Sequence, residues 1–318
     1  MVAKIFIDGE AGTTGLQIRE RLAGRRDLDI LSIPAERRKD IGARAELLNV
    51  ADVAILCLPD EAARESVSLI TNSTTRVIDA SSAYRVDPDW AYGFAEMDKA
   101  QAGLIAGAMR VSNPGCYPQG PIATLRPLIA AGLLPADFAI SVNAISGYSG
   151  GGKAMIADYE AAGADASAFM PYGLTFNHKH VPEMTTYTRL AHAPLFVPAV
   201  GDYAQGMVTF VPLQLGALAR VPTGAEIHAA IADHFAAIKD SFVTVAPYEA
   251  LARTPELDPE SYNNTNQMKL HVFANDARAQ AVLVAVYDNL GKGASGAAVQ
   301  NMNLMLGMDA ALGLGLAA

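Results

Sequence analysis

The first third of the chain alternates between strand and helix patterns, and this rhythm constrains the fold more than any other feature. Strand patterns occupy KIFIDG (4–9), DILSIP (29–34), ADVAILCLP (51–59) and RVIDAS (76–81), and amphipathic helix patterns occupy TTGLQIRERLAG (13–24) and DEAARESVSLIT (60–71). ADVAILCLP is nearly all apolar, as expected for a parallel strand covered on both faces. The alternation predicts an open, doubly wound, Rossmann-like α/β sheet.

After residue 117 the pattern becomes richer in strands. Strands are expected at FAISVNAIS (138–146), PLFVPAV (194–200), MVTFVPLQL (207–215), FVTVAPY (242–248) and QAVLVAVYDNL (280–290), and helices at PIATLRPLIAAG (121–132), after SGGGK (149–153) and at TGAEIHAAIADHFAAI (223–238). Thr223 and Glu226 form a capping box at the start of the last of these helices. The apolar segment 294–318 reads as a closing helix that packs back on the first domain. We predict a dinucleotide-binding domain at 1–117, completed by 290–318, and a second, α+β domain at 118–289.

Composition excludes several classes of protein. The chain has 318 residues, of which 51% are hydrophobic and 18% charged, so a large core is expected and disorder is not. A net charge of −9 argues against nucleic acid and anionic membranes as partners. No apolar run reaches the length of a membrane span, the N-terminus lacks a signal-peptide pattern, and the two cysteines are too few for a disulfide scaffold. A cytoplasmic location is therefore expected.

A glycine-rich turn joins the first strand to the first helix. In IFIDGEAGTTGLQI, Gly9, Gly12 and Gly15 flank Thr13 and Thr14. Glycines at this point permit a tight turn and the close approach of a pyrophosphate to main-chain N–H groups at a helix N-terminus. The spacing is GxxGxxG rather than GxGxxG, and the turn opens a βαβ unit, so we interpret it as a dinucleotide site.

The tip of the second strand favours NADP over NAD. An NAD site usually places an acidic residue there for the ribose 2′-hydroxyl. Here the tip reads LSIPAERRK, with Ser32 near the place of the acid and Arg37, Arg38 and Lys39 after it. A hydroxyl and cations suit a 2′-phosphate, whereas Asp29 lies too early to serve as the ribose acid. The alternative is that ERRK is only a solvated helix start.

VSNPGCYPQG places one of the two cysteines between turn formers, after the strand pattern GLIAGAMRVSN (103–113) and before a helix. A thiol at a helix N-terminus has a lowered pKa and is a candidate nucleophile, so Cys116 is interpreted as catalytic. Cys57 lies inside an apolar strand and is interpreted as a small buried residue.

A nucleophile needs a group that moves protons, and FNHKHVPEM gathers several candidates. His178, His180 and Glu183 lie together there, and Pro182 suits the first turn of a following helix. We favour a proton-transfer and oxyanion-binding cluster; a metal site or an ordinary polar loop are the alternatives.

Two further segments suit anions. Arg85 follows the strand RVIDAS at a carboxyl end, where open sheets bind ligands and where arginine can grip a carboxylate or phosphate. SGYSGGGKAM is a second glycine loop that enters a helix, and its free amides with Ser146, Ser149 and Lys153 could hold an anion. Each could instead be an ordinary loop.

Taken together, SNPGCYP, SGYSGGGK, HKHVPE and the late DNLGKGASGAAVQNMN resemble the shorter class (type 2) of the N-acetyl-γ-glutamyl-phosphate reductases, in the semialdehyde dehydrogenase superfamily. The resemblance covers nearly the whole chain. It implies a Rossmann-like domain that binds NADP(H), and a semialdehyde-dehydrogenase-type catalytic domain that also makes a homo-oligomer, a dimer or tetramer. It further implies NADPH-dependent reduction of an acyl phosphate to a semialdehyde in arginine biosynthesis.

The resemblance also implies residue roles. Cys116 would attack the acyl phosphate, release inorganic phosphate and hold a thioester that hydride then reduces. His178, His180 and Glu183 would share oxyanion binding and proton transfer, in a division that the residues leave open. Asn289 and Gly293 would lie beside the nicotinamide, with Arg85, Ser146, Ser149 and Lys153 on the substrate.

Two rival functions stay open from the sequence. One is the same chemistry on another acyl phosphate, either aspartyl phosphate or a carrier-linked aminoadipyl phosphate, since side chains that differ by a methylene or an acyl cap are poorly separated by sequence. The other is an NADPH-binding regulator without turnover, which would not need Cys116. No metal is expected in any of these.

Overall fold

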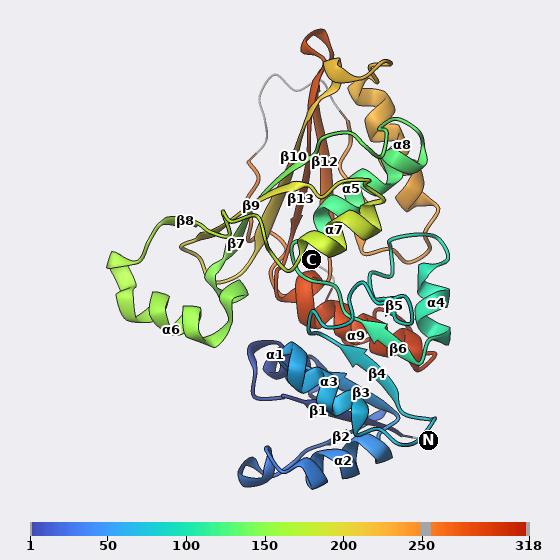
Figure 1. The fold of residues 1–318 in the computed structure, drawn as a ribbon, viewed down its shortest axis with the longest axis vertical. Coiled ribbons are helices and arrows are strands. Elements are labelled where there is room, and N and C mark those ends of the chain that lie inside the picture. The colour runs from blue at the N-terminus through green and yellow to red at the C-terminus, as the bar shows by residue number, and fades with distance from the viewer. Residues whose placement is uncertain (1, 249–255, 316–318) are drawn as a thin grey trace. The chain divides into compact units, whose positions relative to one another are not determined.

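The computed structural model describes residues 2–248 and 256–315, which form two compact units. The first unit comprises the chain up to Ala95, with Ala100–Gly115 and Ala294–Gly315, and the second comprises Glu96–Lys99 and Cys116–Gly293. Figure 1 shows the chain from its blue N-terminus to its red C-terminal helix. Among the described residues, no helix is both long enough and apolar enough to cross a membrane.

The first unit is a parallel sheet with the order β2-β1-β3-β4-β6-β5. Its strands are β1 (Ala3–Asp8), β2 (Leu28–Leu31), β3 (Val53–Leu56), β4 (Arg76–Asp79), β5 (Ala91–Tyr92) and β6 (Arg110–Ser112). Its helices are α1 (Thr13–Leu22), α2 (Ile41–Val50), α3 (Asp60–Ser68), α4 (Gln101–Gly107) and α9 (Gly296–Met305). Every residue of β3 is buried, as its apolar sequence predicted. The strand order reverses between β1 and β3, which is where doubly wound sheets open a crevice for ligands.

The C-terminal helix belongs to the first unit, where α9 packs against α1, α4 and β4. The predicted helix over 294–318 is too long, because α9 ends at Met305 and residues 316–318 lie outside the described residues. Gly307 explains the end: its φ of +68° is left-handed, and its N–H bonds back to the carbonyl of Leu304.

A second prediction was wrong at GLIAGAMRVSN (103–113). Only Arg110–Ser112 form a strand, and the residues before them complete α4. Gln101 and Ile105, one turn apart, are the two buried residues of α4. The buried residues of α4 therefore have the spacing of a helix, which the short apolar run did not reveal.

The second unit is a mixed sheet with the order β11-β12-β13-β10-β7-β9-β8. Its strands are β7 (Ser141–Gly147), β8 (Phe169–Pro171), β9 (Leu195–Gly201), β10 (Met207–Gln214), β11 (Val243–Val245), β12 (Met268–Asn275) and β13 (Gln280–Tyr287). Its α-helices are α5 (Gln119–Ala130), α6 (Gly152–Ala162), α7 (Val181–Thr188) and α8 (Gly224–Ala236). Short 3-10 helices occur in both units: η1 (Ala35–Arg37) in the first, and η2 (Tyr148–Gly151), η3 (Gly163–Asp165), η4 (Leu215–Ala217) and η5 (Asp276–Arg278) in the second. A π-helical turn, η6 (Gly291–Ser295), precedes α9.

Helix α5 lies at the centre of the second unit. It packs against β13 and β10 and is flanked by α7 and α8 (Figure 1). All of its residues from Gln119 to Leu128 are buried, including the polar Gln119, Thr124 and Arg126. The predicted capping box of Thr223 and Glu226 is present at the start of α8. The turn that carries Cys116 leads into α5, which is buried over most of its length.

Candidate active site

The three glycines of the β1–α1 turn serve two different purposes. A β carbon on Gly9 would lie 2.4 Å from the Cys57 carbonyl oxygen, and one on Gly15 would lie 2.6 Å from the Gly9 carbonyl oxygen. The packing of the turn thus excludes side chains at both positions, and Gly9 also has a φ of +88°. Gly12, the N-cap of α1, is not crowded in this way, since its nearest atom would be 3.4 Å away. The missing side chain of Gly12 therefore leaves room for a ligand at the α1 N-terminus.

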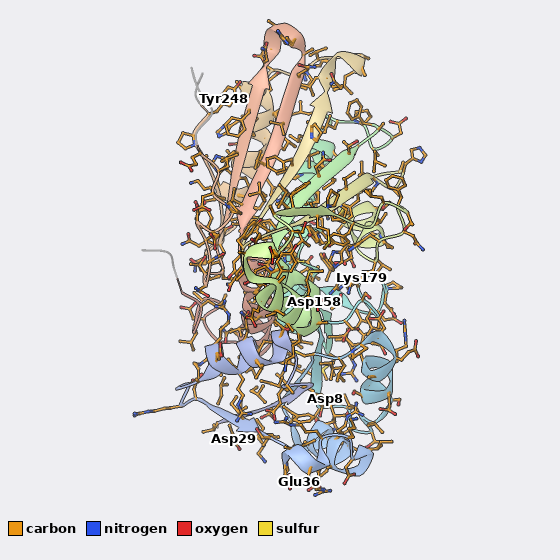
Figure 2. The ribbon with its side chains drawn as sticks, turned by 90° about the vertical axis from the view of Figure 1, so that its left-hand side faces the viewer. Asp8, Asp29, Glu36, Asp158, Lys179 and Tyr248 are labelled. Atoms are coloured by element: carbon orange, nitrogen blue, oxygen red, sulfur yellow. The ribbon has the colours of Figure 1, made fainter. Side chains whose placement is uncertain are left out.

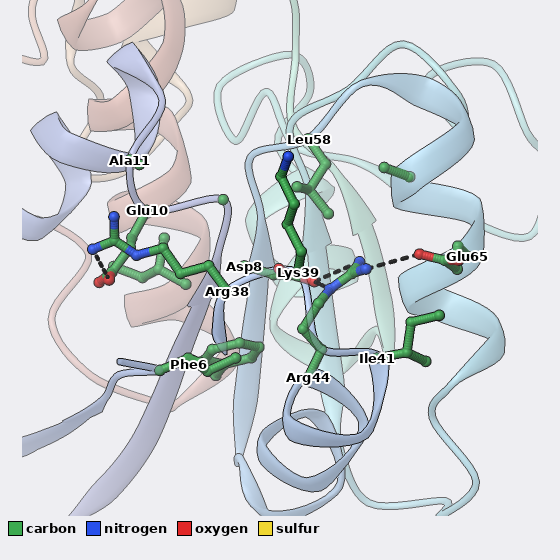
Figure 3. A pocket seen from close by; sticks show the side chains of 14 residues that line it. Phe6, Asp8, Glu10, Ala11, Arg38, Lys39, Ile41, Arg44, Leu58 and Glu65 are labelled. Atoms are coloured by element: carbon green, nitrogen blue, oxygen red, sulfur yellow. Dashed lines mark hydrogen bonds and ion pairs between the residues drawn. The ribbon is translucent and has the colours of Figure 1, made fainter. Parts of the chain in front are cut away.

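A cavity of about 390 Å³ opens beside this turn, at the carboxyl ends of β1 and β3 (Figure 3). Its lining comes from β1, the glycine turn, the segments after β2 and β3, α2 and α3: Phe6, Ile7, Asp8, Gly9, Glu10, Ala11, Ile33, Arg38, Lys39, Ile41, Arg44, Leu58, Ala62 and Glu65. The cavity has apolar walls with charged groups at its edge. This combination suits an adenosine moiety whose phosphates reach the cations.

The floor of this cavity holds a buried ion pair that the sequence did not reveal. Arg44 donates to Asp8 and to Glu65 (Figure 3). It also donates to the Ser66 hydroxyl. Burial alone would lower the pKa of Arg44, but the bonds to Glu65 and Asp8 raise it, so the guanidinium stays charged. Asp8 is the last residue of β1. A polar residue at the carboxyl end of a parallel strand often lies near a ligand site, and this was the one sequence feature that could have indicated the ion pair.

A cluster of four side chains, which we call the β2-tip cluster, gathers where β2 ends. Arg19 of α1 donates to the Ser32 hydroxyl at 3.0 Å and pairs with Glu10, and Arg38 pairs with Glu10 at 3.1 Å. Sequence reasoning predicted Ser32 here but missed Arg19 and Glu10, because α1 and the glycine turn reach this point only in the folded chain.

Arg37 does not join this cluster. Its guanidinium pairs with Asp40, the N-cap of α2, at 2.9 Å, and it is absent from the cavity lining. The cations that line the cavity are Arg38, Lys39 and the buried Arg44. Asp29, which the sequence placed too early to serve as the ribose acid, lies within β2 at an exposed position (Figure 2).

Cys116 lies in the turn immediately before α5, in the second unit. The hydroxyl of Tyr287 donates to its carbonyl oxygen at 2.7 Å, and a β carbon on Gly293 would lie 2.9 Å from its own β carbon. The thiol residue is thus enclosed by segments far apart in the sequence. For comparison, burial raises the pKa of the Cys57 thiol to about 12, and this favours the interpretation of Cys57 as an unreactive residue.

One tyrosine, Tyr172, and two histidines contact Tyr117, the residue that follows the cysteine. Tyr117 is buried, and its ring contacts the rings of His178 and His180, while its hydroxyl accepts a hydrogen bond from Tyr172. Burial raises the pKa of Tyr117 and raises that of Tyr172 to about 12, with the Cys116 thiol adding to both shifts. Both phenols therefore remain neutral hydrogen-bond donors beside the thiol.

The geometry of His178 selects one tautomer. Its Nδ1 accepts the backbone N–H of His180 at 3.2 Å, so the proton of the neutral ring lies on Nε2. The His178 and His180 rings pack edge to face, 4.7 Å between centroids. His180 is the N-cap of α7, Pro182 occupies its first turn as predicted, and Glu183 follows, 1% exposed. Lys179, between the histidines, is exposed (Figure 2).

The second glycine loop is tied to the protein rather than open. The amides of Gly147, Tyr148 and Ser149 donate to carbonyls of the 203–206 segment. The expectation of free amides is therefore wrong for these three positions, because a neighbouring loop takes them. Ser146 is buried in β7, and Lys153 is exposed on α6.

Asn289 connects this loop to the end of β13. Its Nδ2 donates to the Ser149 hydroxyl at 3.0 Å, and its Oδ1 accepts the N–H of Gly206 at 2.7 Å. Asn289 thus holds Ser149 in place, a role that the sequence did not indicate.

Arg85, in the first unit, folds back on the carboxyl end of β4 and donates to the Ala80 carbonyl at 2.9 Å. Nearby Asp79 is fully buried, and its oxygens accept the N–H and hydroxyl of Ser81. Burial raises the pKa of Asp79, which the bonds to Ser81 partly offset. Arg85 therefore lies at the strand end where the sequence placed it.

Comparison with known proteins identifies the family. The chain is 72% identical over 308 residues to an N-acetyl-γ-glutamyl-phosphate reductase of Mesorhizobium japonicum, covering 97% of this chain and 100% of that protein. A reductase of the same name from Burkholderia cenocepacia is 54% identical over 310 residues, covering 96% and 98%. The chain belongs to the N-acetyl-γ-glutamyl-phosphate reductase family. The predicted resemblance is thereby confirmed.

Family models divide the reductase chain in two. Residues 4–104 match the semialdehyde dehydrogenase NAD binding domain, and residues 116–289 match the semialdehyde dehydrogenase dimerisation domain. These matches confirm the prediction of an oxidoreductase that uses a nicotinamide dinucleotide, with a Rossmann-like domain followed by a semialdehyde-dehydrogenase-type domain.

Solved structures share the reductase fold. Aspartate semialdehyde dehydrogenase II from Vibrio cholerae superposes with a TM-score of 0.73 at 16% identity, over 96% of this chain and 98% of that one. Aspartate semialdehyde dehydrogenase with NADP from Candida albicans gives 0.69 at 12% identity, over 96% and 99%. At such identity the likeness concerns the fold alone.

The reductase structure also contains a buried ion pair beside the nucleophile turn. Lys292 and Glu96 are both buried and pair at 2.6 Å, and the Lys292 carbonyl accepts the side chain of Gln119, the first residue of α5. Burial lowers the pKa of Lys292, and Glu96 opposes this shift. No periodicity or spacing links residues 96, 119 and 292, so this element was invisible in the sequence.

Proposed function

We propose that the chain catalyses the NADPH-dependent reduction of N-acetyl-L-glutamyl 5-phosphate to N-acetyl-L-glutamate 5-semialdehyde, with release of inorganic phosphate, in arginine biosynthesis. The observation that carries this proposal is the enclosed turn of Cys116 before α5, beside histidines and neutral tyrosines, in a chain 72% identical to a reductase of that name. A thiol so placed is suited to attack an activated acyl group.

The first unit has the features that an NADP cofactor needs. The cavity suits an adenosine, and the space at Gly12 admits a pyrophosphate to the N-terminus of α1. We assign Gly9, Gly12, Thr13, Thr14 and Gly15 to the pyrophosphate turn. We assign Ser32 with Arg19 and Arg38 to the 2′-phosphate, in place of Arg37. When bound, NADPH supplies the hydride for the reduction.

The second unit supplies the covalent chemistry. The Cys116 thiolate attacks the acyl carbon, the bond from that carbon to the phosphate oxygen breaks, and a thioester remains on the sulfur. An acyl phosphate is already activated, so phosphate needs little acid assistance to leave. After reduction of the thioester carbonyl, the carbon–sulfur bond breaks, and the semialdehyde leaves with the thiolate restored.

The main demand on the protein is then stabilisation of the oxyanion and orientation of the carbonyl. In the neutral His178 ring the proton lies on Nε2, so we assign His178 as a hydrogen-bond donor to the carbonyl oxygen of the substrate. His180 and Glu183 are buried beside it, and we assign them to proton transfer and to substrate orientation.

The remaining polar residues are assigned to substrate and cofactor. Arg85, Ser146, Ser149 and Lys153 would bind the anionic groups of the substrate, and Asn289 positions Ser149. Gly293 packs against Cys116 so closely that a side chain would clash, and we assign it to the nicotinamide side of the nucleophile.

We further propose that the protein works in the cytoplasm as a homo-oligomer. The match of residues 116–289 to a dimerisation domain supports assembly through the second unit, as a dimer or tetramer. The boundaries we propose are 1–117 with 290–318 for the NADP domain, and 118–289 for the catalytic and oligomerisation domain.

The reverse reaction tests the assignment directly. NADP reduction would be measured with N-acetyl-glutamate semialdehyde and phosphate, with aspartate semialdehyde as the parallel substrate, for wild type and Cys116→Ala. We expect phosphate-dependent turnover that prefers the N-acetyl substrate and disappears in the variant. Turnover with aspartate semialdehyde alone would support the thioester mechanism and contradict the proposed substrate. NADP binding without turnover of either aldehyde would contradict the proposed catalytic activity.

A further inference from the structure

The segment that leaves β13 contacts the nucleophile turn at two places. Tyr287 is the last residue of β13 and is fully buried in the second unit. Its strand pairs with β12 on one side and with β10 on the other. The backbone of Tyr287 is therefore held by pairing on both sides, and this fixes where its side chain begins.

The hydroxyl of Tyr287 joins both ends of the nucleophile turn. It donates to the carbonyl oxygen of Cys116 at 2.7 Å, and it accepts the backbone N–H of Gly120 at 3.2 Å. Burial raises the pKa of Tyr287 well above its usual value, so the hydroxyl keeps the proton that it donates. One hydroxyl thus connects the cysteine to the first turn of α5.

The start of α5 has no capping side chain of its own. The N-cap is Pro118, which provides no side-chain hydrogen bond, although the first amides of a helix have no partner within the helix. The Tyr287 hydroxyl takes the Gly120 amide from outside. A β carbon on Gly120 would lie 2.2 Å from the Thr209 hydroxyl, so this end of α5 is also pressed against β10.

The same segment then returns to the cysteine from another direction. The N–H of Gly293 donates to the carbonyl of Asp288 at 2.8 Å, and this bend brings Gly293 against the Cys116 β carbon. Cys116 is thus held at its carbonyl by Tyr287 and at its β carbon by Gly293.

We propose that Tyr287 is a positioning residue for the nucleophile. Its hydroxyl fixes the backbone of Cys116 to the N-terminus of α5, so that the thiol stays where the helix field favours the thiolate. This inference rests on the proposed function for its effect on turnover, but not for its effect on the thiol.

The test compares Tyr287→Phe with wild type. The ring fills the same space and only the hydroxyl is lost. The matched control is Tyr159→Phe, because Tyr159 is also a buried tyrosine of the second unit whose hydroxyl donates to a backbone carbonyl, that of Ser167. Alkylation of Cys116 by iodoacetamide would be followed against pH by peptide mass, without any substrate.

We expect the alkylation profile of Tyr287→Phe to move to higher pH, and kcat in the reverse assay to fall by on the order of ten- to a hundredfold, with the KM for NADP little changed. Hydrogen exchange of the Gly120 amide should become faster. Tyr159→Phe should change none of these.

An alkylation profile and kcat that match the control would overturn the proposal. Tyr287→Phe could also lower Tm more than the control does. Hydrogen exchange in the folded variant then separates the two explanations: a general loss of stability speeds exchange at Gly120 and at its neighbours alike, whereas loss of the Tyr287 hydrogen bond speeds exchange at Gly120 in particular. If wild type turned over neither aldehyde while the alkylation profile shifted, the positioning role would stand and the assigned reaction would fall.

Discussion

The two units build their sites in opposite ways. The first unit arranges its ligand features along a short stretch, from Asp8 of β1 to Glu65 of α3, and much of the site is backbone exposed by glycines. The second unit packs segments that are distant in the sequence around the Cys116 turn: Tyr287 donates to Cys116, and His178 contacts the adjacent Tyr117. A site made of backbone depends on where side chains are absent, whereas a site made of side chains depends on how distant segments meet.

This difference predicts which substitutions stay local. A change in the second unit should remove chemistry and leave dinucleotide binding intact, and a change in the first unit should do the reverse. The predictions below test that separation, from the largest expected effect to the smallest.

The largest effect is expected for Cys116→Ser. Loss of the thiolate should lower kcat by at least about a thousandfold, because the covalent step is lost. The dissociation constant for NADP, measured by calorimetry, should stay within about twofold, since the charged binding groups lie in the first unit. A parallel loss of NADP binding would contradict the separation.

Gly293→Ala should affect catalysis next most strongly. The new methyl would lie 2.9 Å from the Cys116 β carbon, so the turn must shift, and kcat should fall by about a hundredfold. Gly216→Ala in the same unit is the control, because its nearest atom would be 3.6 Å away. Equal activity of the two variants would show that the close approach at Gly293 does not matter.

In the first unit, Arg19→Met and Arg38→Met should each weaken the binding of 2′,5′-ADP by about tenfold, because a charge-assisted hydrogen bond to phosphate is removed. Binding of 5′-AMP, which lacks the 2′-phosphate, should not change. Arg37→Met is the matched control, since its guanidinium pairs with Asp40. Weaker binding in that variant alone would restore Arg37 as the phosphate ligand.

Glu10→Gln should have the opposite sign. The Glu10 carboxylate now pairs with Arg19 and Arg38, so it competes with a 2′-phosphate for both. Its neutralisation should tighten 2′,5′-ADP binding by a few-fold, on the order of the strength of exposed ion pairs. Weaker binding in titration calorimetry would mean that Glu10 orients the arginines instead.

The smallest effect concerns the other thiol. The pKa of Cys57 is raised to about 12 by burial, so its thiolate is scarce below that pH. At pH 8 iodoacetamide should label Cys116 and leave Cys57 unlabelled until the chain is unfolded. Mass analysis of the two peptides checks this, and early labelling of Cys57 would refute it.

The fold of the first unit followed largely from the sequence. Strand and helix alternation is a local pattern, and β1, β3, β4 and α1 lie where it predicted them. The errors came where local pattern and tertiary packing disagree: the apolar run before Arg110 became α4 against α9, and α9 stopped at Gly307.

The sequence by itself determined the architecture, the glycine turn, the family and the candidate nucleophile, because each of these is written in neighbouring residues or in their periodicity. Only the tertiary structure decided that Arg19 meets Ser32 and that Arg38 pairs with Glu10, whereas Arg37 pairs with Asp40. It also decided that Asn289 holds Ser149. It alone brought the hydroxyl of Tyr287 to Cys116, across 171 positions of sequence. A hydrogen bond between distant residues depends on the packing of the sheet and helices between them, and no local pattern encodes it.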